Sequence, residues 1–465
     1  MSPTANPRKR KGWFEGLLRK VPIGFYRNLS WQFVASMTSV AVGFVYSILV
    51  ARTIGVGDFG LMSLGLSFAT VTFQVVELRL QEAVIRYVAE FWEARDDRRT
   101  VAALKLFLFA DLGTGLVAFS LVLVGARWAE AHLLHDARGP SVMFLAATTV
   151  FFSNVATATA YGVYRVFGEF RLQAIIMIAT SVAKLVATTV AMFALGCGVV
   201  GVLVVAAAAS LIANGLLIGF AVRVLLQRIS RGDLRAPLSL LAERKVEMRK
   251  FVTNTYLLSL TMIPTKDLDT NILGIFAPLH VVGVYKIAKS FMSAVWTVSD
   301  PIFLVVYPEL ARLWTRRAFG ELRAFIKRIV VVGGVSALAA YLVAFATVPA
   351  IIVKLLGAGY APAGSLFRWM TWGVVIWGPL VWVNPLLMAA GRPDLVLKSS
   401  LGTALATLAL FWLVIPHAGA LGAGIVSALA TPIVLSFAII LGRRNGIILP
   451  PPDGATGQLG AVRPR

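Results

Sequence analysis

The chain has 465 residues, of which 58% are hydrophobic, and it carries a formal net charge of +22. This hydrophobic fraction excludes an ordinary soluble globular protein. The positive charge lies in gaps between apolar runs without a basic–aromatic module, so membrane topology explains it and no nucleic-acid partner is expected. A single cysteine, Cys197, excludes intrachain disulfides, and His132 and His135 have no third ligand nearby, so we expect neither metal nor cofactor.

Twelve apolar runs follow one another along the chain, and most are close to the roughly 20 residues that span a bilayer as a helix. Backbone groups in lipid must be hydrogen-bonded within their own segment, so each run is expected to be a helix. The runs are 31–50, 59–76, 106–126, 141–164, 172–195, 199–222, 251–277, 281–307, 329–353, 364–390, 399–417 and 418–441. This pattern predicts an all-α polytopic membrane protein with 12 transmembrane helices.

The basic residues alternate between the gaps. The N-terminal segment, every second gap and the C-terminal segment hold most of the 44 Lys and Arg residues. The remaining gaps hold only Arg52, Arg127, Arg138 and Lys354. By the positive-inside rule, both termini are expected to be cytoplasmic.

The two sets of six runs are related as an internal repeat. Gly168 matches Gly391 and Tyr87 matches Tyr307 at a shift of about 220 residues, and other glycines follow the same spacing. Two repeats of six spans have the same orientation, which predicts two parallel lobes around a central cavity. The expected division is a basic segment (1–28), a first lobe (29–222), a cytoplasmic linker (223–250), a second lobe (251–445) and a disordered tail (446–465).

Charged residues within the apolar runs are candidates for function, because a charge at bilayer depth costs several kcal/mol unless it is paired or faces water. Lys184 and Asp111 could form a structural pair in the first lobe or carry a coupling ion. In the second lobe, Lys266 and Asp269 are three residues apart and could neutralise each other, leaving Asp267 in need of another partner.

Further charges complete the set expected around the cavity. The candidate substrate contacts are the cations Arg52, Arg79, Lys184, Lys266, Lys286, Lys289 and Arg368. The candidates for ion coupling or structural pairing are Asp111, Asp267, Asp269 and Asp300. If all face inward, cations exceed anions by three. The stripe of Arg79, Glu82, Arg86 and Glu90 also fits a solvated ladder at the inner end of the second helix.

Several ordered motifs carry a family resemblance. The segment Ala51-Arg52-Thr53-Ile54-Gly55 with Asp58-Phe59-Gly60-Leu61 resembles the first-loop signature of polysaccharide transporters, the Wzx-like oligosaccharide flippases. Their superfamily is that of the multidrug/oligosaccharidyl-lipid/polysaccharide exporters. In the second half, Asp269–Gly274, Val282–Tyr285 and Tyr307-Pro308 repeat the pattern, although Thr270 stands where many relatives carry a basic residue.

The resemblance implies a flippase of the bacterial inner membrane that moves an undecaprenyl-pyrophosphate-linked oligosaccharide from the cytoplasmic to the outer leaflet by alternating access. It also implies phosphate contacts at Arg52 and Arg79, with membrane lipids and the polysaccharide polymerase machinery as partners. Two alternatives remain: a cation-coupled multidrug exporter of the same superfamily, and a membrane polymerase or glycosyltransferase. A mostly basic cavity disfavours the first, and the lack of a sizeable external loop for catalysis disfavours the second.

Overall fold

The structure, a computed structural model, describes residues 23–448 except 231, 262, 264–266, 298 and 299, and it leaves the side chains of 23–29, 297 and 300–305 undescribed. Throughout this part of the chain the regular structure is helical and contains no strand. Eight helical segments are long and apolar enough to cross a membrane, and a ninth is the pair Ala358–Leu380 and Val383–Ala389, bent by 42°. The fold class is therefore confirmed as an all-α multi-pass membrane protein.

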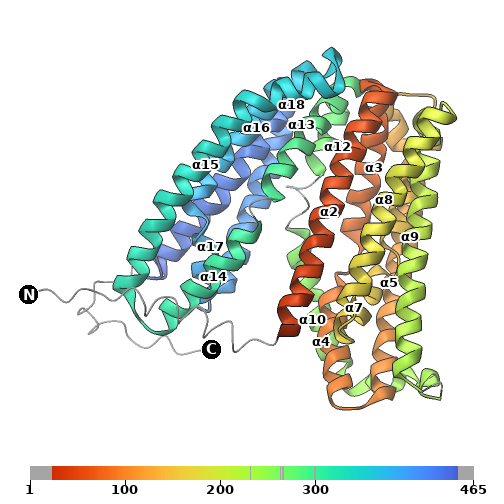
Figure 1. Cartoon of the computed structure of the whole chain (residues 1–465), viewed down its shortest axis with the longest axis vertical. Helices are drawn as coiled ribbons and strands as arrows, with labels where there is room; N and C mark the ends of the chain where they lie inside the picture. Colours follow the sequence, from red (N-terminus) through yellow and green to blue (C-terminus); the bar gives the residue numbers. More distant parts are fainter. Residues whose placement is uncertain (1–22, 231, 262, 264–266, 298–299, 449–465) are drawn as a thin grey trace, which may run out of the picture.

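The first half of the chain forms one group of helices, which lie together in Figure 1. They are α2 (Ile23–Ile54), α3 (Val56–Val76), α4 (Leu80–Glu93), α5 (Asp97–Ala129), η1 (Glu130–Leu134), α6 (Gly139–Asn154), α7 (Thr157–Val166), α8 (Phe170–Ala194) and α9 (Val199–Arg228). The linker contributes two short 3₁₀ turns, η2 (Asp233–Arg235) and η3 (Leu238–Arg244), which pack against α5.

The second half forms the other group, except that α10 (Lys245–Leu260), the first helix after the linker, packs against α3, α4 and η3 in the first group. The other group consists of α12 (Leu268–Phe276), α13 (Leu279–Thr297), α14 (Asp300–Thr315), α15 (Phe319–Leu356), η4 (Ala358–Tyr360), α16 (Ala361–Leu380), α17 (Val383–Ala389) and α18 (Pro393–Arg444). The seventh and eighth predicted spans are divided between shorter helices, so the count of 12 spans stays a prediction. Helix α18 covers the last two predicted spans and is interrupted at Gly419, next to the predicted boundary between them.

Left-handed backbone positions recur at equivalent places in the two halves. Gly168 (φ 76°) and Gly391 (φ 73°) precede α8 and α18, as the repeat in the sequence leads us to expect. Arg95 (φ 55°) and Arg317 (φ 54°) occupy the same place in the α4–α5 and α14–α15 turns. Non-glycine residues seldom adopt this conformation, so its recurrence supports the duplication of one six-helix unit.

The two groups of helices approach each other at one end and diverge at the other (Figure 1). Helix α3 packs along α13 at the closed end. The α4–α5 turn, the linker and the α14–α15 turn, which carry many of the basic residues, all lie at the divergent end. The chain therefore has a V shape whose open end bears the positive charge.

Two glycines allow the closed end to form. A Cβ atom at Gly60 would overlap the carbonyl oxygen of Leu279, and one at Gly283 would overlap that of Val56, both well inside the 3.0 Å limit of real contacts. Gly60 and Gly283 are 223 residues apart, the same shift that relates Gly168 to Gly391. Because neither has a side chain, α3 and α13 cross backbone against backbone.

Candidate functional site

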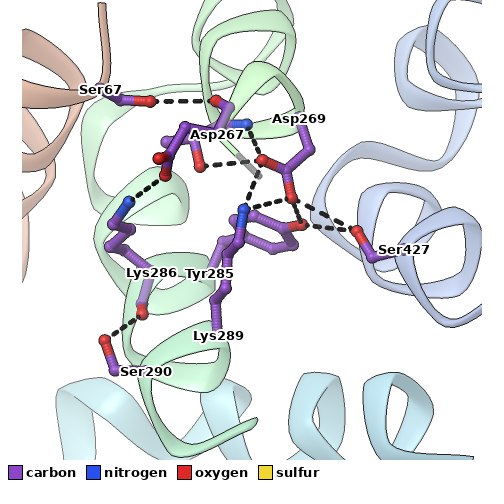
Figure 2. A network of polar contacts seen from close by, with 9 residues as sticks. Ser67, Asp267, Asp269, Tyr285, Lys286, Lys289, Ser290 and Ser427 are labelled. Carbon is purple, nitrogen blue, oxygen red and sulfur yellow. Dashed lines mark hydrogen bonds and ion pairs between the residues drawn. The ribbon is translucent and has the colours of Figure 1, made fainter. Parts of the chain in front are cut away.

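A cluster of charged side chains lies where α12 and α13 meet the first half of the chain (Figure 2). Asp267 precedes α12 and Asp269 lies in its first turn, where the amide dipoles of a helix favour a carboxylate. Lys286 and Lys289 stand one turn apart on α13 and therefore share a face. The short Ala277-Pro278 connection folds α13 back along α12, which brings the two lysines to the two aspartates.

The four charges form two ion pairs. Lys286 Nζ donates to Asp267 Oδ1 at 2.9 Å, and both side chains are about a quarter exposed. Lys289 Nζ donates to Oδ1 and Oδ2 of Asp269 at 2.7 and 2.8 Å. Asp269 is only 1% exposed, so this second pair is the more deeply buried. Lys266, which the sequence suggested as a partner of Asp269, lies outside the described residues, so that pairing stays a prediction.

Hydroxyl groups complete the environment of Asp269. The Tyr285 hydroxyl donates to Asp269 Oδ2 at 2.5 Å, and Ser427 on α18 donates to the same oxygen at 3.3 Å. Figure 2 shows both side chains converging on this carboxylate from different helices. A buried carboxylate requires such donors, because an unpaired charge away from water is strongly destabilising. The Asp269 environment therefore joins α12, α13 and α18.

The same cluster is bonded to the other half of the chain. The Ser67 hydroxyl on α3 donates to the backbone carbonyl of Asp267 at 3.0 Å. Nearby, Leu64 of α3 occupies the space above Gly274, where a Cβ atom would collide with it. The charge cluster, defined as Asp267, Asp269, Lys286 and Lys289, thus lies at the contact between the halves.

The Lys184–Asp111 pair, one of the readings that the sequence left open, does not form in the structure. Lys184 on α8 lies over the Tyr46 ring, with Nζ 5.1 Å from the ring centroid, and no described carboxylate forms an ion pair with it. It lines a separate pocket of about 170 Å³ inside the first half. Asp111 is 2% exposed and instead faces the Ala158 and Thr159 amides at the start of α7.

The remaining predicted residues are dispersed. Arg52 is exposed in the last turn of α2, and Arg79 pairs with Glu82 at 3.3 Å before α4. Arg368 lies in a groove between α15 and α16. Asp300 is the first residue of α14, but its side chain lies outside the described set. Among the described side chains, the structure thus brings together four of the predicted charges, two of each sign, without a surplus of cations.

Sequence reasoning missed the uncharged members of the network. Tyr285 lies four residues before Lys289 and one before Lys286, so its spacing from Lys289 already puts the two on one helix face. That signal could have identified it. Ser67 and Ser427 lie on other helices, and nothing in their local sequence points to Asp267 or Asp269.

A second charged network holds the linker. Arg244 of η3 donates to Glu90 at 2.8 Å and to Glu247 at 2.6 Å, and Arg86 reaches Glu247 at 3.4 Å. The hydrogen bond from Arg244 holds the pKa of Glu247 below its usual value. Arg86 and Glu90 belong to the stripe interpreted from the sequence as a solvated ladder; here they dock the linker onto α4.

Comparison with known proteins places these features in a family. A family model described as "Polysaccharide biosynthesis protein" matches residues 25–314. No curated protein sequence matches the chain. Among solved structures, an inward-facing multidrug resistance MATE transporter of the MOP superfamily is similar over 88% of this chain and 94% of its own, with 15% identity and a TM-score of 0.72.

Two further structures bear on the fold. The lipid II flippase MurJ in an inward closed conformation is similar over 88% of this chain and 87% of its own, with 10% identity and a TM-score of 0.67. An outward-facing MATE transporter gives a TM-score of 0.56 at 14% identity, covering 90% of this chain and 95% of its own. At these identities the likeness establishes a shared transporter fold.

Proposed function

Because this chain belongs to the polysaccharide biosynthesis protein family, we propose that it is a flippase that carries an undecaprenyl-pyrophosphate-linked oligosaccharide from the cytoplasmic to the outer leaflet. The observation that carries the proposal is the V-shaped pair of helical halves, closed at the α3–α13 contact and divergent at the basic end. Two halves that rock about such a contact can expose the region between them to each side in turn.

The charge distribution indicates which side of the membrane the open end of the V faces. The α4–α5 turn, the linker and the α14–α15 turn carry the basic residues that the positive-inside rule assigns to the cytoplasm. We therefore infer that the V opens inward, with both termini cytoplasmic in a bacterial inner membrane. Reporter fusions at Arg235 and after Arg444 test this topology, and an external signal at either position would refute it.

The chemistry of the substrate explains why a protein path is needed. A pyrophosphate-linked sugar is dianionic and heavily hydroxylated, so it cannot leave water for hydrocarbon without a large free-energy cost. The prenyl tail can remain in lipid while the head moves between the halves. Lys286 is the best-placed phosphate contact of the cluster, because it is partly exposed and pairs with a carboxylate that is itself partly exposed.

Lys289 has a different role in this proposal. Its ammonium contacts both oxygens of a carboxylate that is almost wholly buried, so it stabilises the fold at the contact between the halves. Arg52, exposed at the end of α2, and Arg79 remain candidate phosphate contacts on the two sides of the membrane. Their involvement requires that they face the substrate path during the transport cycle.

Transport can be measured in vesicles that contain the purified protein and a lipid-linked oligosaccharide, with an external lectin to report sugars that reach the outer leaflet. We expect Lys286→Ala to reduce this signal at least tenfold while inserting normally, whereas Lys354→Ala, an exposed lysine at the end of α15, serves as the matched control. In cells, depletion should trap the glycolipid in the inner leaflet. A normal glycolipid distribution with a new drug sensitivity would favour the multidrug exporter instead.

A further inference from the structure

A groove of about 360 Å³ lies between α15 and α16, apart from the charge cluster. Its wall is aromatic with a single cation. The residues that line it are Tyr341, Phe345, Ser365, Arg368, Trp369 and Trp372. Among the residues that the structure describes, no other helix contributes to this wall and no acidic residue lines it.

The groove faces away from the other half of the chain. On α16, Trp377 packs edge-on against Trp296 of α13, the helix that contacts α3. Arg368 lies nine residues before Trp377, which is two and a half turns of an α-helix and therefore the opposite face. Trp369, beside it, is 52% exposed. In a membrane protein this surface meets lipid rather than the path between the halves.

The depth of Arg368 matches a headgroup. Helix α16 begins at Ala361, at the end of the molecule where the halves meet, and Arg368 lies seven residues further on, about 10 Å along the axis. A long arginine side chain can extend towards the interface from that depth. Its guanidinium can therefore reach the level of the lipid phosphates in the leaflet at the closed end.

The guanidinium has capacity left for an anion. Nε donates to the Phe345 carbonyl at 3.2 Å, and the group stacks on the Phe345 ring at 4.5 Å from its centroid. Among the described residues no carboxylate pairs with Arg368, and the N–H groups on its two terminal nitrogens make no hydrogen bond to them. An arginine in apolar surroundings without a counter-charge is costly, and a phosphate satisfies its planar fork with two parallel hydrogen bonds.

We propose that this groove binds an anionic phospholipid of the leaflet at the closed end, with its phosphate on Arg368 and an acyl chain along Tyr341 and Trp372. The aromatic wall suits a hydrocarbon chain and the lone cation suits a negative headgroup, so the lipid satisfies both parts of the site. This site lies outside the transport path, and its occupancy does not depend on whether the protein moves an oligosaccharide.

Native mass spectrometry of the purified full-length protein tests the proposal, with phosphatidylglycerol, phosphatidylcholine and inorganic phosphate as separate probes. We expect one phosphatidylglycerol to bind in clear preference to phosphatidylcholine, and inorganic phosphate not to compete. Arg368→Gln should weaken this binding about ten- to a hundredfold, as expected for the loss of charge-assisted hydrogen bonds. Lys354→Ala, which removes a cation from α15 outside the groove, should leave binding unchanged.

A second variant keeps the proposal testable if Arg368→Gln folds poorly. Ser365 lies on the exposed rim of the groove, so Ser365→Trp should fill the groove while retaining the arginine, and it should also abolish phosphatidylglycerol binding. Equal binding of the two lipids, effective competition by inorganic phosphate, or wild-type binding by both variants would each overturn the proposal.

Discussion

The crossing of α3 and α13 predicts that a single methyl group will shift the conformational equilibrium. A Cβ atom at Gly283 would overlap the carbonyl oxygen of Val56, and relief of this overlap requires the two helices to separate by about 1 Å. Overpacking of this kind costs about 1–3 kcal/mol, which corresponds to about a 5- to 150-fold change in an equilibrium constant. Only the state with the helices crossed bears this cost, so Gly283→Ala should populate the state in which the end is open.

Thiol labelling from the closed side measures the shift. Ser63 is 4% exposed on α3, one turn beyond Gly60 and hence on the face that meets α13. In a Cys197→Ala background, Ser63→Cys should react slowly with a membrane-impermeant reagent, and Gly283→Ala should raise its rate severalfold or more. The matched control is Gly57→Ala on the same helix, where a Cβ atom meets nothing within 4 Å.

The reasoning would be refuted if Gly283→Ala is folded, as shown by an unchanged melting profile, but is labelled at the same rate as the control. Gly60→Ala offers an independent repeat from the other helix, because its Cβ atom would overlap the Leu279 carbonyl. If both variants label like Gly57→Ala, the α3–α13 crossing does not close this end.

Three further predictions concern ionisable groups. Lys289→Met should lower the free energy of unfolding by about 3–5 kcal/mol, because it leaves the buried Asp269 carboxylate without its cation. Adding Asp269→Asn should restore much of the lost stability in melting experiments, and no recovery would contradict the pairing. Asp111→Asn should be at least as stable as the wild type, because Asp111 is buried without a cationic partner among the described residues and asparagine carries no charge; a clear drop in Tm would argue against this. Arg244 lowers the pKa of Glu247 in the folded protein. The contribution of Glu247 to linker docking is therefore present above the ordinary glutamate pKa of 4.5, and it is lost as the pH falls through the lower pKa of the folded state. In the wild type, the backbone amides of η3 should exchange faster over that acid range. In Glu247→Gln they should exchange faster than in the wild type at all pH values, and pH-independent protection of η3 in both proteins would contradict the assignment.

The sequence by itself determined the fold class and many of the turns, and it predicted a side of the membrane for each loop. These properties depend on one-dimensional patterns, because a helix in lipid satisfies its backbone within its own segment and basic loops resist translocation. The boundary predicted between residues 417 and 418 lies beside the interruption at Gly419, and the paired glycines Gly168 and Gly391 share a left-handed conformation. Local chemistry was sufficient in each of these cases.

Only the tertiary structure decided the partners of the charged side chains. Spacing along a helix showed that Lys286 and Lys289 share a face, but the pairing with Asp267 and Asp269 depends on how α13 folds back along α12. Lys184 and Asp111 were plausible partners by depth, yet rotation of their helices points them to different neighbours. Such pairings depend on the rotation and packing of whole helices, which the pattern within one helix does not encode.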